Sequence, residues 1–173
     1  MNDWPEQLRK AFAEGVERYR AGQRRVDGFF ADDEVEFLAE LGCSAQEMFD
    51  FVEDYSGGGD PSFETVLLVT AIRRDYFLNE LNGKPAAETR PMGNFPGKSD
   101  ELDGIAWLPR IIEKARSKLR GELPPEMMYG CGGDRPFLKR HNINLGDFLR
   151  FVWRAGDDTQ SIVDYVKNKG ETA

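Results

Sequence analysis

The chain has 173 residues but only two cysteines, Cys43 and Cys131, and a single histidine, His141. Two cysteines are too few for a disulfide framework. Cys131, Asp134 and His141 show no recognised spacing of metal ligands, so we expect no metal and no cofactor. No apolar run approaches the length of a membrane span, and the first residues lack the apolar stretch of a secretory signal. We therefore expect a cytoplasmic protein without membrane association.

Positive charge is missing from a long stretch of the N-terminal half. From Val26 to Ile72 there is no lysine or arginine, yet there are 12 acidic residues. Residues 1–83 carry a net charge of −10, whereas residues 84–173 carry +2 and residues 104–154 carry +5. Such an imbalance affects association and solubility more than the fold. We expect the acidic and basic segments to face each other or a second copy of the chain; a basic surface for an anionic partner is the alternative.

A pattern in the first half recurs 100 residues later without a gap. The corresponding segments are Phe37-Leu38 and Phe137-Leu138, Gly42-Cys43-Ser44 and Asn142-Ile143-Asn144, Glu47-Met48-Phe49 and Asp147-Phe148-Leu149, and Phe51-Val52 and Phe151-Val152. This indicates one helix pair used twice, over about residues 33–52 and 133–152. Because Cys43 corresponds to Ile143 just before a helix cap, we expect Cys43 to be a small buried apolar group rather than a catalytic one.

Capping residues and apolar spacing predict an all-α fold of two small helical subdomains. The predicted helices cover about 4–21, 32–41, 45–57, 62–81, 105–120, 134–141, 145–155 and 157–170. We expect Asp32 or Asp33 to begin the second helix, Pro61 to suit the start of the fourth, and Pro109 to kink the fifth or to mark its true first turn. Residues 83–103 hold three prolines and three glycines without a period, so we predict a linker or long loop between subdomains 1–82 and 104–173.

The loop from Tyr129 to Arg135 is the strongest candidate site. Cys131 precedes a helix start and lies near basic residues, and both features favour a thiolate. A thiol-dependent enzyme that uses Cys131 is therefore one hypothesis. The structural alternative, which we favour, is that Tyr129 and Cys131 fill the core and Asp134 caps the helix.

The same glycine-rich loop is also a candidate for binding a small anion. Its candidate ligand-binding residues are Arg110, Tyr129, Cys131, Asp134 and Arg135. Backbone amides before a helix can cradle a phosphate, but the carboxylate of Asp134 would fill the place of the anion. A lone glycine cluster is weak evidence, and no Walker-type lysine follows it.

Five basic residues lie along the helix predicted after Gly104. Arg110, Lys114 and Lys118 share one face, and Arg116 and Arg120 form a second line. A nucleic-acid-binding surface would require aromatic residues between the basic ones and a basic protein, and neither is present. We expect a solvated face paired with acids, which disfavours nucleic acid as a partner.

The C-terminal part also resembles a known family. The resemblance rests on Leu102-Asp103-Gly104-Ile105, on the helix Leu108-Pro109-Arg110-Ile111-Ile112-Glu113-Lys114-Ala115-Arg116, and on the loop Tyr129-Gly130-Cys131 with Asp134-Arg135, and it extends to Gly170. These residues are similar to those of an uncharacterised bacterial helical domain family of unknown function. Residues 30–81 look like an N-terminal extension of some of its relatives. The resemblance implies a compact helical domain and no activity.

No catalytic constellation is apparent, so the biochemical function is not set by the sequence. The duplicated helix pair and the uneven charge favour a non-catalytic helical module that binds another protein or a second copy of itself. Binding of a small anion near Cys131 and Arg135 and thiol chemistry at Cys131 stay as alternatives.

Overall fold

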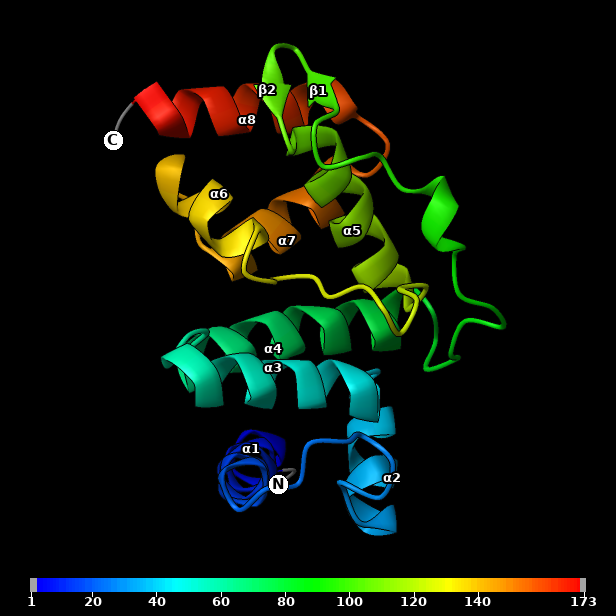
Figure 1. Cartoon of the computed structure of the whole chain (residues 1–173). Coiled ribbons are helices and arrows are strands. Elements are labelled where there is room, and N and C mark those ends of the chain that lie inside the picture. Colours follow the sequence, from blue (N-terminus) through cyan, green and yellow to red (C-terminus); the bar gives the residue numbers. More distant parts are fainter. Residues whose placement is uncertain (1–2, 172–173) are drawn as a thin grey trace. The chain divides into compact units, whose positions relative to one another are not determined.

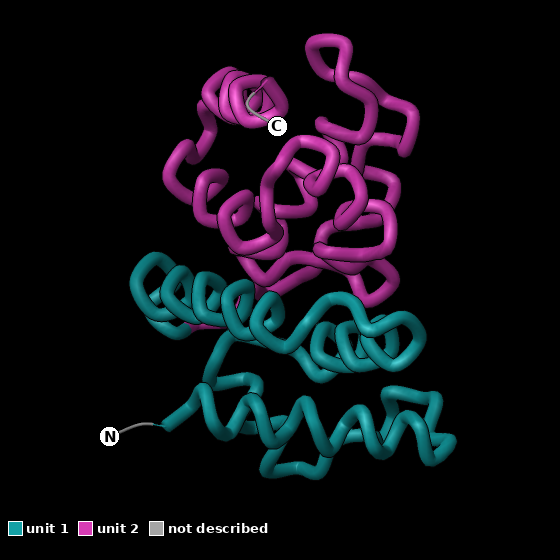
Figure 2. Tube along the Cα trace, turned by 90° about the vertical axis from the view of Figure 1, so that its left-hand side faces the viewer, with its two compact units in different colours: residues 1–83 teal, residues 84–173 magenta. Residues whose placement is uncertain are grey.

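The computed structural model describes residues 3–171. The described residues form two compact units, residues 3–83 and 84–171 (Figures 1 and 2). The described elements are α1 (Trp4–Arg20), α2 (Asp32–Glu40), α3 (Ala45–Gly58), α4 (Phe63–Asn79), the 3₁₀ turn η1 (Met92–Asn94), β1 (Glu101–Leu102), β2 (Ile105–Ala106), α5 (Leu108–Arg120), α6 (Asp134–Arg140), α7 (Leu145–Ala155) and α8 (Thr159–Glu171). The predicted all-α fold is confirmed, apart from one small two-stranded sheet.

In the first unit, α1 packs against α3 and α4, and α2 packs against α3. Aromatic rings fill the space between these helices. Phe12 of α1 contacts Tyr55 and Phe63 at centroid distances of 5.3 and 5.6 Å, and Phe29 contacts Phe49 at 4.9 Å. Tyr55 is half-buried. Burial of such large apolar surfaces is the main force that holds the helices together.

Of two helix starts in the first unit, one matches the prediction and the other differs from it. α2 begins at Asp32, as predicted, and the amide of Ala31 before it donates to the carboxylate of Glu34 at 2.8 Å. α4 begins at Phe63, and the hydroxyl of Ser62 accepts from the amide of Thr65 at 3.4 Å. Pro61 therefore lies before the cap and outside the first turn.

The turn between α2 and α3 and the turn between α6 and α7 have the same hydrogen-bond pattern. The amides of Cys43 and Ile143 donate to the carbonyl groups of Leu38 and Leu138, both at 2.9 Å. Gly42 and Asn142 both adopt a left-handed backbone with positive φ. At the next helix start, Ser44 accepts from the amide of Glu47 at 3.1 Å and Asn144 accepts from that of Asp147 at 2.7 Å. The surroundings are not identical throughout, since Phe137 is buried and Phe37 is half-buried.

In the second unit, α5 packs against α7, and α7 packs against α8. β1 and β2 form an antiparallel hairpin in which Leu102 pairs with Ile105. The prediction of a helix beginning at Ile105 was therefore wrong, because Asp103 and Gly104 both have positive φ and form a tight hairpin turn. α5 begins only at Leu108, with Pro109 in its first turn, so the second alternative for this proline is correct.

Residues 84–107 are bonded to α5 and to the segment after it. Arg90 forms an ion pair with Glu113 at 2.5 Å, and its amide donates to the carbonyl of Glu122 at 2.7 Å. Burial alone would raise the pKa of Glu113, but hydrogen bonds from Arg90 and Arg116 outweigh it and lower the pKa. Phe95 is 8% exposed. This segment is therefore part of the second unit.

None of the helices within residues 3–171 is both long and apolar enough to cross a lipid bilayer.

Candidate functional site

A buried carboxylate, Asp134, forms the centre of the candidate site in the second unit. Its side chain is fully buried and accepts hydrogen bonds from three segments of the chain. The indole N–H of Trp107 donates to Oδ1 at 2.8 Å, while the ammonium of Lys114 and the amide of Gly130 donate to Oδ2 at 2.5 and 2.9 Å. Asp134 is itself the first residue of α6, and it does not cap that helix as predicted. It instead connects the hairpin, α5 and the loop before α6.

Lys114 is a partner of Asp134 that the sequence did not suggest. Its side chain is 2% exposed, and its ammonium donates to Sγ of Cys131 at 3.3 Å as well as to Asp134. Lys118, one turn later, is also 2% exposed. The expected solvated face of Arg110, Lys114 and Lys118 is therefore wrong for both lysines. A buried ammonium requires a partner because its desolvation is costly, and Asp134 supplies the opposite charge to Lys114.

The backbone between Trp107 and Gly133 is closely packed. Trp107 has a positive φ of 74° and places its indole ring against Gly133. A Cβ at position 133 would lie 2.5 Å from Cη2 of Trp107. The neighbouring Gly132 has no such contact within 4 Å. Only Gly133 of these two is therefore required for the approach of the ring that bonds Asp134.

The other predicted site residues take separate positions. Tyr129 is 2% exposed and donates its hydroxyl to the carbonyl of Leu145 at 2.7 Å, and burial raises the pKa of its phenol well above the usual value. Arg135 donates to the carbonyl of Gly130 at 2.7 Å. Arg110 donates to the carbonyl of Pro96 at 2.6 Å and lies over the ring of Trp107. Tyr129 fills the core as expected, whereas Cys131 is only half-buried.

The arrangement limits the chemistry that this loop can perform. Oδ2 of Asp134 already accepts a hydrogen bond from the amide of Gly130. An anion that binds this amide would have to displace the carboxylate, which is also paired with Lys114. Among residues 3–171 no three histidine, cysteine, aspartate or glutamate side chains are grouped so that they could hold a metal ion. The group that combines partial exposure with a reactive side chain is Cys131.

Sequence reasoning found the loop but missed Lys114 and Trp107. Both reach Asp134 over separations of 20 and 27 residues, and spacing along the chain carries no information about such contacts. One local signal did exist. Lys114 follows Ile111 by three residues and precedes Ala115 on the apolar stripe of α5, so its stem borders the core.

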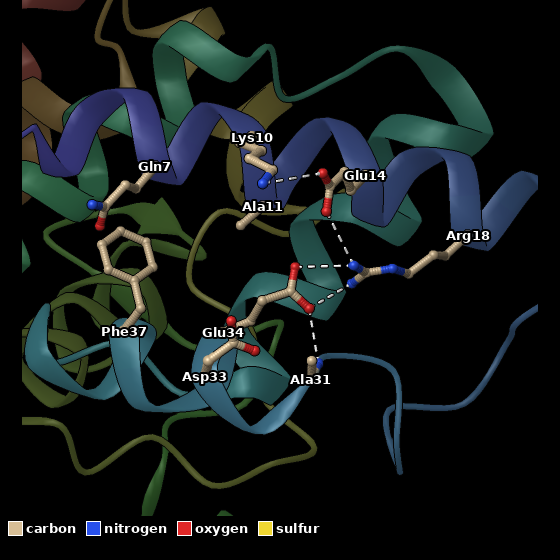
Figure 3. Close-up of a pocket in the computed structure, with 9 residues that line it drawn as sticks. All are labelled: Gln7, Lys10, Ala11, Glu14, Arg18, Ala31, Asp33, Glu34 and Phe37. Carbon is tan, nitrogen blue, oxygen red and sulfur yellow. Dashed lines mark hydrogen bonds and ion pairs between the residues drawn. The ribbon is translucent and has the colours of Figure 1, made fainter.

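The first unit has a hollow of about 420 Å³ between α1 and α2 (Figure 3). Charged groups in its wall are bonded to one another. Arg18 donates to Glu34 at 2.8 Å and to Glu14 at 3.2 Å, and the hydrogen bond with Glu34 raises the pKa of Arg18. Lys10 pairs with Glu14 at 3.8 Å. The Arg18–Glu34 pair connects α1 to α2 and the other two lie within α1, so these charges serve the packing of the two helices.

Comparisons with known proteins give a family for one part of the chain only. No curated protein and no solved structure matches the chain. The family resemblance predicted for about residues 102–170 is confirmed as a match to an uncharacterised family, although the match carries no activity. Residues 96–173 match the family described as a domain of unknown function, DUF5069.

Proposed function

We propose that the chain is a non-catalytic protein-interaction module whose acidic surface binds a positively charged protein. The acidic surface is defined by exposed acids at and around α2 and on α3: Asp27, Asp32, Asp33, Glu36, Glu40 and Glu53. It lies in the stretch Val26–Ile72, which contains no lysine or arginine. Val35 of α2 is 40% exposed beside these acids and adds an apolar contact.

The observation that carries the proposal is the absence of lysine and arginine from the stretch Val26–Ile72, and the state of Asp50 on α3 supports it. Burial and the neighbouring carboxylates of Glu53, Asp54 and Glu47 raise its pKa to about 6, although a hydrogen bond from Gln46 acts in the other direction. Burial is the main cause of this shift, and the three carboxylates add a smaller repulsion along α3. A cationic partner would relieve this repulsion, and the relief would contribute to binding.

The ion pairs of the second unit favour a separate basic protein as the partner, rather than a second copy of this chain bound through its positive charge. Many of the basic groups are already paired within that unit. The pairs are Arg90–Glu113, Lys114–Asp134, Arg116–Glu113, Arg120–Glu122, Arg150–Asp147 and Lys167–Asp103. A second copy of the chain therefore offers less free positive charge than its composition suggests, and a basic protein is the better match.

Two further expectations belong to this proposal. The helix pairs α2–α3 and α6–α7 are two copies of one structural unit, which is supported by their shared turn hydrogen bonds. The location is the cytoplasm, which is supported by the lack of a disulfide at either cysteine within residues 3–171.

The test compares the wild-type chain with a variant that lacks four charges on α2. The variant carries Asp32→Asn, Asp33→Asn, Glu36→Gln and Glu40→Gln. The control removes four exposed acids of the second unit, through Glu88→Gln, Glu101→Gln, Glu126→Gln and Asp157→Asn. Each tagged chain is recovered from cells of its source, and the bound proteins are identified and titrated with salt.

Support requires a basic protein that binds the wild type and the control, fails to bind the α2 variant, and dissociates as salt rises, because exposed charge pairs are screened. Circular dichroism must show that the α2 variant is folded. Equal recovery by all three chains, or a dimer in sedimentation that the α2 variant also forms, would contradict the proposal.

A further inference from the structure

The contact between Lys114 and Cys131 joins a buried amine to a half-buried thiol. Nζ of Lys114 lies 3.3 Å from Sγ of Cys131, and the lysine side chain is 2% exposed. The lysine is fixed on α5, and the cysteine lies in the loop before α6. The proposed interaction with a basic partner uses neither residue.

The amine also has a proton acceptor in place. Oδ2 of Asp134 lies 2.5 Å from Nζ, and this carboxylate is fully buried. Loss of one proton from the ammonium to Asp134 would leave a neutral amine next to the sulfur. Cys131 is half-buried, so this part of the loop is partly open to solvent. This opening is the route by which a small oxidant reaches Sγ, whereas the amine of Lys114 lies on the buried side.

We propose that Cys131 and Lys114 form a covalent cross-link when the protein is exposed to a peroxide. In the first step, Sγ attacks one peroxide oxygen and the O–O bond breaks. The departing hydroxide takes the thiol proton as water, and the cysteine becomes a sulfenic acid. Sulfur is oxidised by two electrons and the peroxide is reduced by two.

In the second step, the amine of Lys114 attacks the sulfenic sulfur. The S–N bond forms and the S–O bond breaks. The ammonium gives one proton to Asp134 and a second to the departing hydroxide, which leaves as water. The product is a sulfenamide in which a covalent bond between α5 and the loop replaces the ion pair. A second peroxide oxidises the sulfenamide by two electrons: its O–O bond and the S–N bond break, one oxygen bonds to both sulfur and nitrogen, and the other leaves as water.

A disulfide is the competing fate of an oxidised cysteine, and the surroundings of Cys43 do not favour it. Cys43 is the one other cysteine of the chain. It is 4% exposed in the first unit, and its thiol contacts the carbonyl of Ser44 at 3.5 Å. Lys114 is thus the nucleophile that the structure places beside Cys131.

The test treats the full chain with hydrogen peroxide, blocks remaining thiols with N-ethylmaleimide, and measures the intact mass. A loss of about 2 Da marks the sulfenamide, and a gain of about 14 Da marks the oxygen-bridged form. Proteolysis must then yield one fragment that contains both Lys114 and Cys131, and dithiothreitol must separate it. The cross-link should form in wild type and in Cys43→Ser, the matched cysteine control, and be absent in Cys131→Ser and Lys114→Arg.

Peptide mapping of the wild type is decisive even if Lys114→Arg does not fold. Addition of oxygen to Cys131, with Lys114 still acetylated by an amine-reactive reagent once the oxidised chain is denatured, would overturn the proposal. So would a Cys43–Cys131 disulfide as the main product. None of these results bears on the acidic surface, so this proposal and the proposed function fail separately.

Discussion

Close packing around a single glycine controls the geometry of the buried polar centre at the residue scale. Gly133 permits the indole of Trp107 to approach the start of α6, where its N–H bonds Asp134. We expect Gly133→Ala to lower the free energy of unfolding by about 1–3 kcal/mol, because the new methyl group must displace the ring. Chemical denaturation, with tryptophan fluorescence as the signal, measures this loss.

Gly132→Ala is the matched control for that substitution. A Cβ at position 132 meets no atom within 4 Å, and this glycine has no positive φ. We expect its stability to stay within about 0.5 kcal/mol of the wild type. Equal loss in the two variants would show that the ring of Trp107 is not packed on Gly133.

Asp50 provides a second residue-scale prediction, on the dependence of stability on pH. Its pKa is raised to about 6 in the folded protein, from 3.8. Between these values the folded state binds more protons than the unfolded state, so the Asp50 contribution falls as pH rises from about 4 to about 6. Asp50→Asn removes this penalty and can still accept the hydrogen bond from Gln46.

Full conversion of that shift would give about 3 kcal/mol. Because Asp50 is only half-buried, solvent screening reduces the expected gain of Asp50→Asn at pH 7 to about 1 kcal/mol. Urea unfolding at pH 4 and pH 7 measures it, and Asp157→Asn, an exposed acid of the second unit, serves as control. A difference between Asp50→Asn and wild type that is the same at both pH values would contradict the assignment.

Helix caps carry the main prediction at the scale of the elements. Ser44 caps α3 and Asn144 caps α7 with equivalent bonds to the third helical residue. Ser44→Ala and Asn144→Ala should each lower the free energy of unfolding by about 1 kcal/mol, because an amide at the helix start loses its acceptor. Calorimetry of each variant measures the change.

Exchange of the two cap residues gives the matched controls. Ser44→Asn and Asn144→Ser each supply the side chain that the other helix pair uses. Both should retain most of the wild-type stability, although Asn144→Ser loses the additional bond from Nδ2 to Asp147. If the exchanged variants were as unstable as the alanine variants, the two caps would not be equivalent.

The same elements show how far sequence alone can predict this fold. Helices with side-chain caps or closing glycines were placed within a few residues, because cap chemistry is local. The hairpin at residues 101–106 was missed although Asp103-Gly104 is a typical hairpin turn, since two-residue strands show no alternation. Cys131 was found from its loop, whereas Lys114 was not, because its approach depends on how α5 packs against that loop.

At the scale of the whole molecule, the division into two units sets which segments should fold together. Residues 83–103 were expected to be a linker or long loop, and residues 84–103 are bonded to the rest of the second unit. Arg90 pairs with Glu113, the carbonyl of Pro96 accepts from Arg110, and β1 pairs with β2. A fragment of residues 84–173 should therefore unfold in one cooperative transition.

A shorter fragment, residues 104–173, tests how much residues 84–103 stabilise the second unit. It lacks Arg90 and β1, and it loses Phe95, which is 8% exposed in the whole chain. Burial of one phenylalanine side chain contributes about 1.5–3 kcal/mol, so the shorter fragment should be less stable by at least about 2 kcal/mol. Urea unfolding of the two fragments side by side measures the difference. Equal stability would mean that residues 84–103 act as a linker after all, and that the second unit is held together by α5–α8 alone.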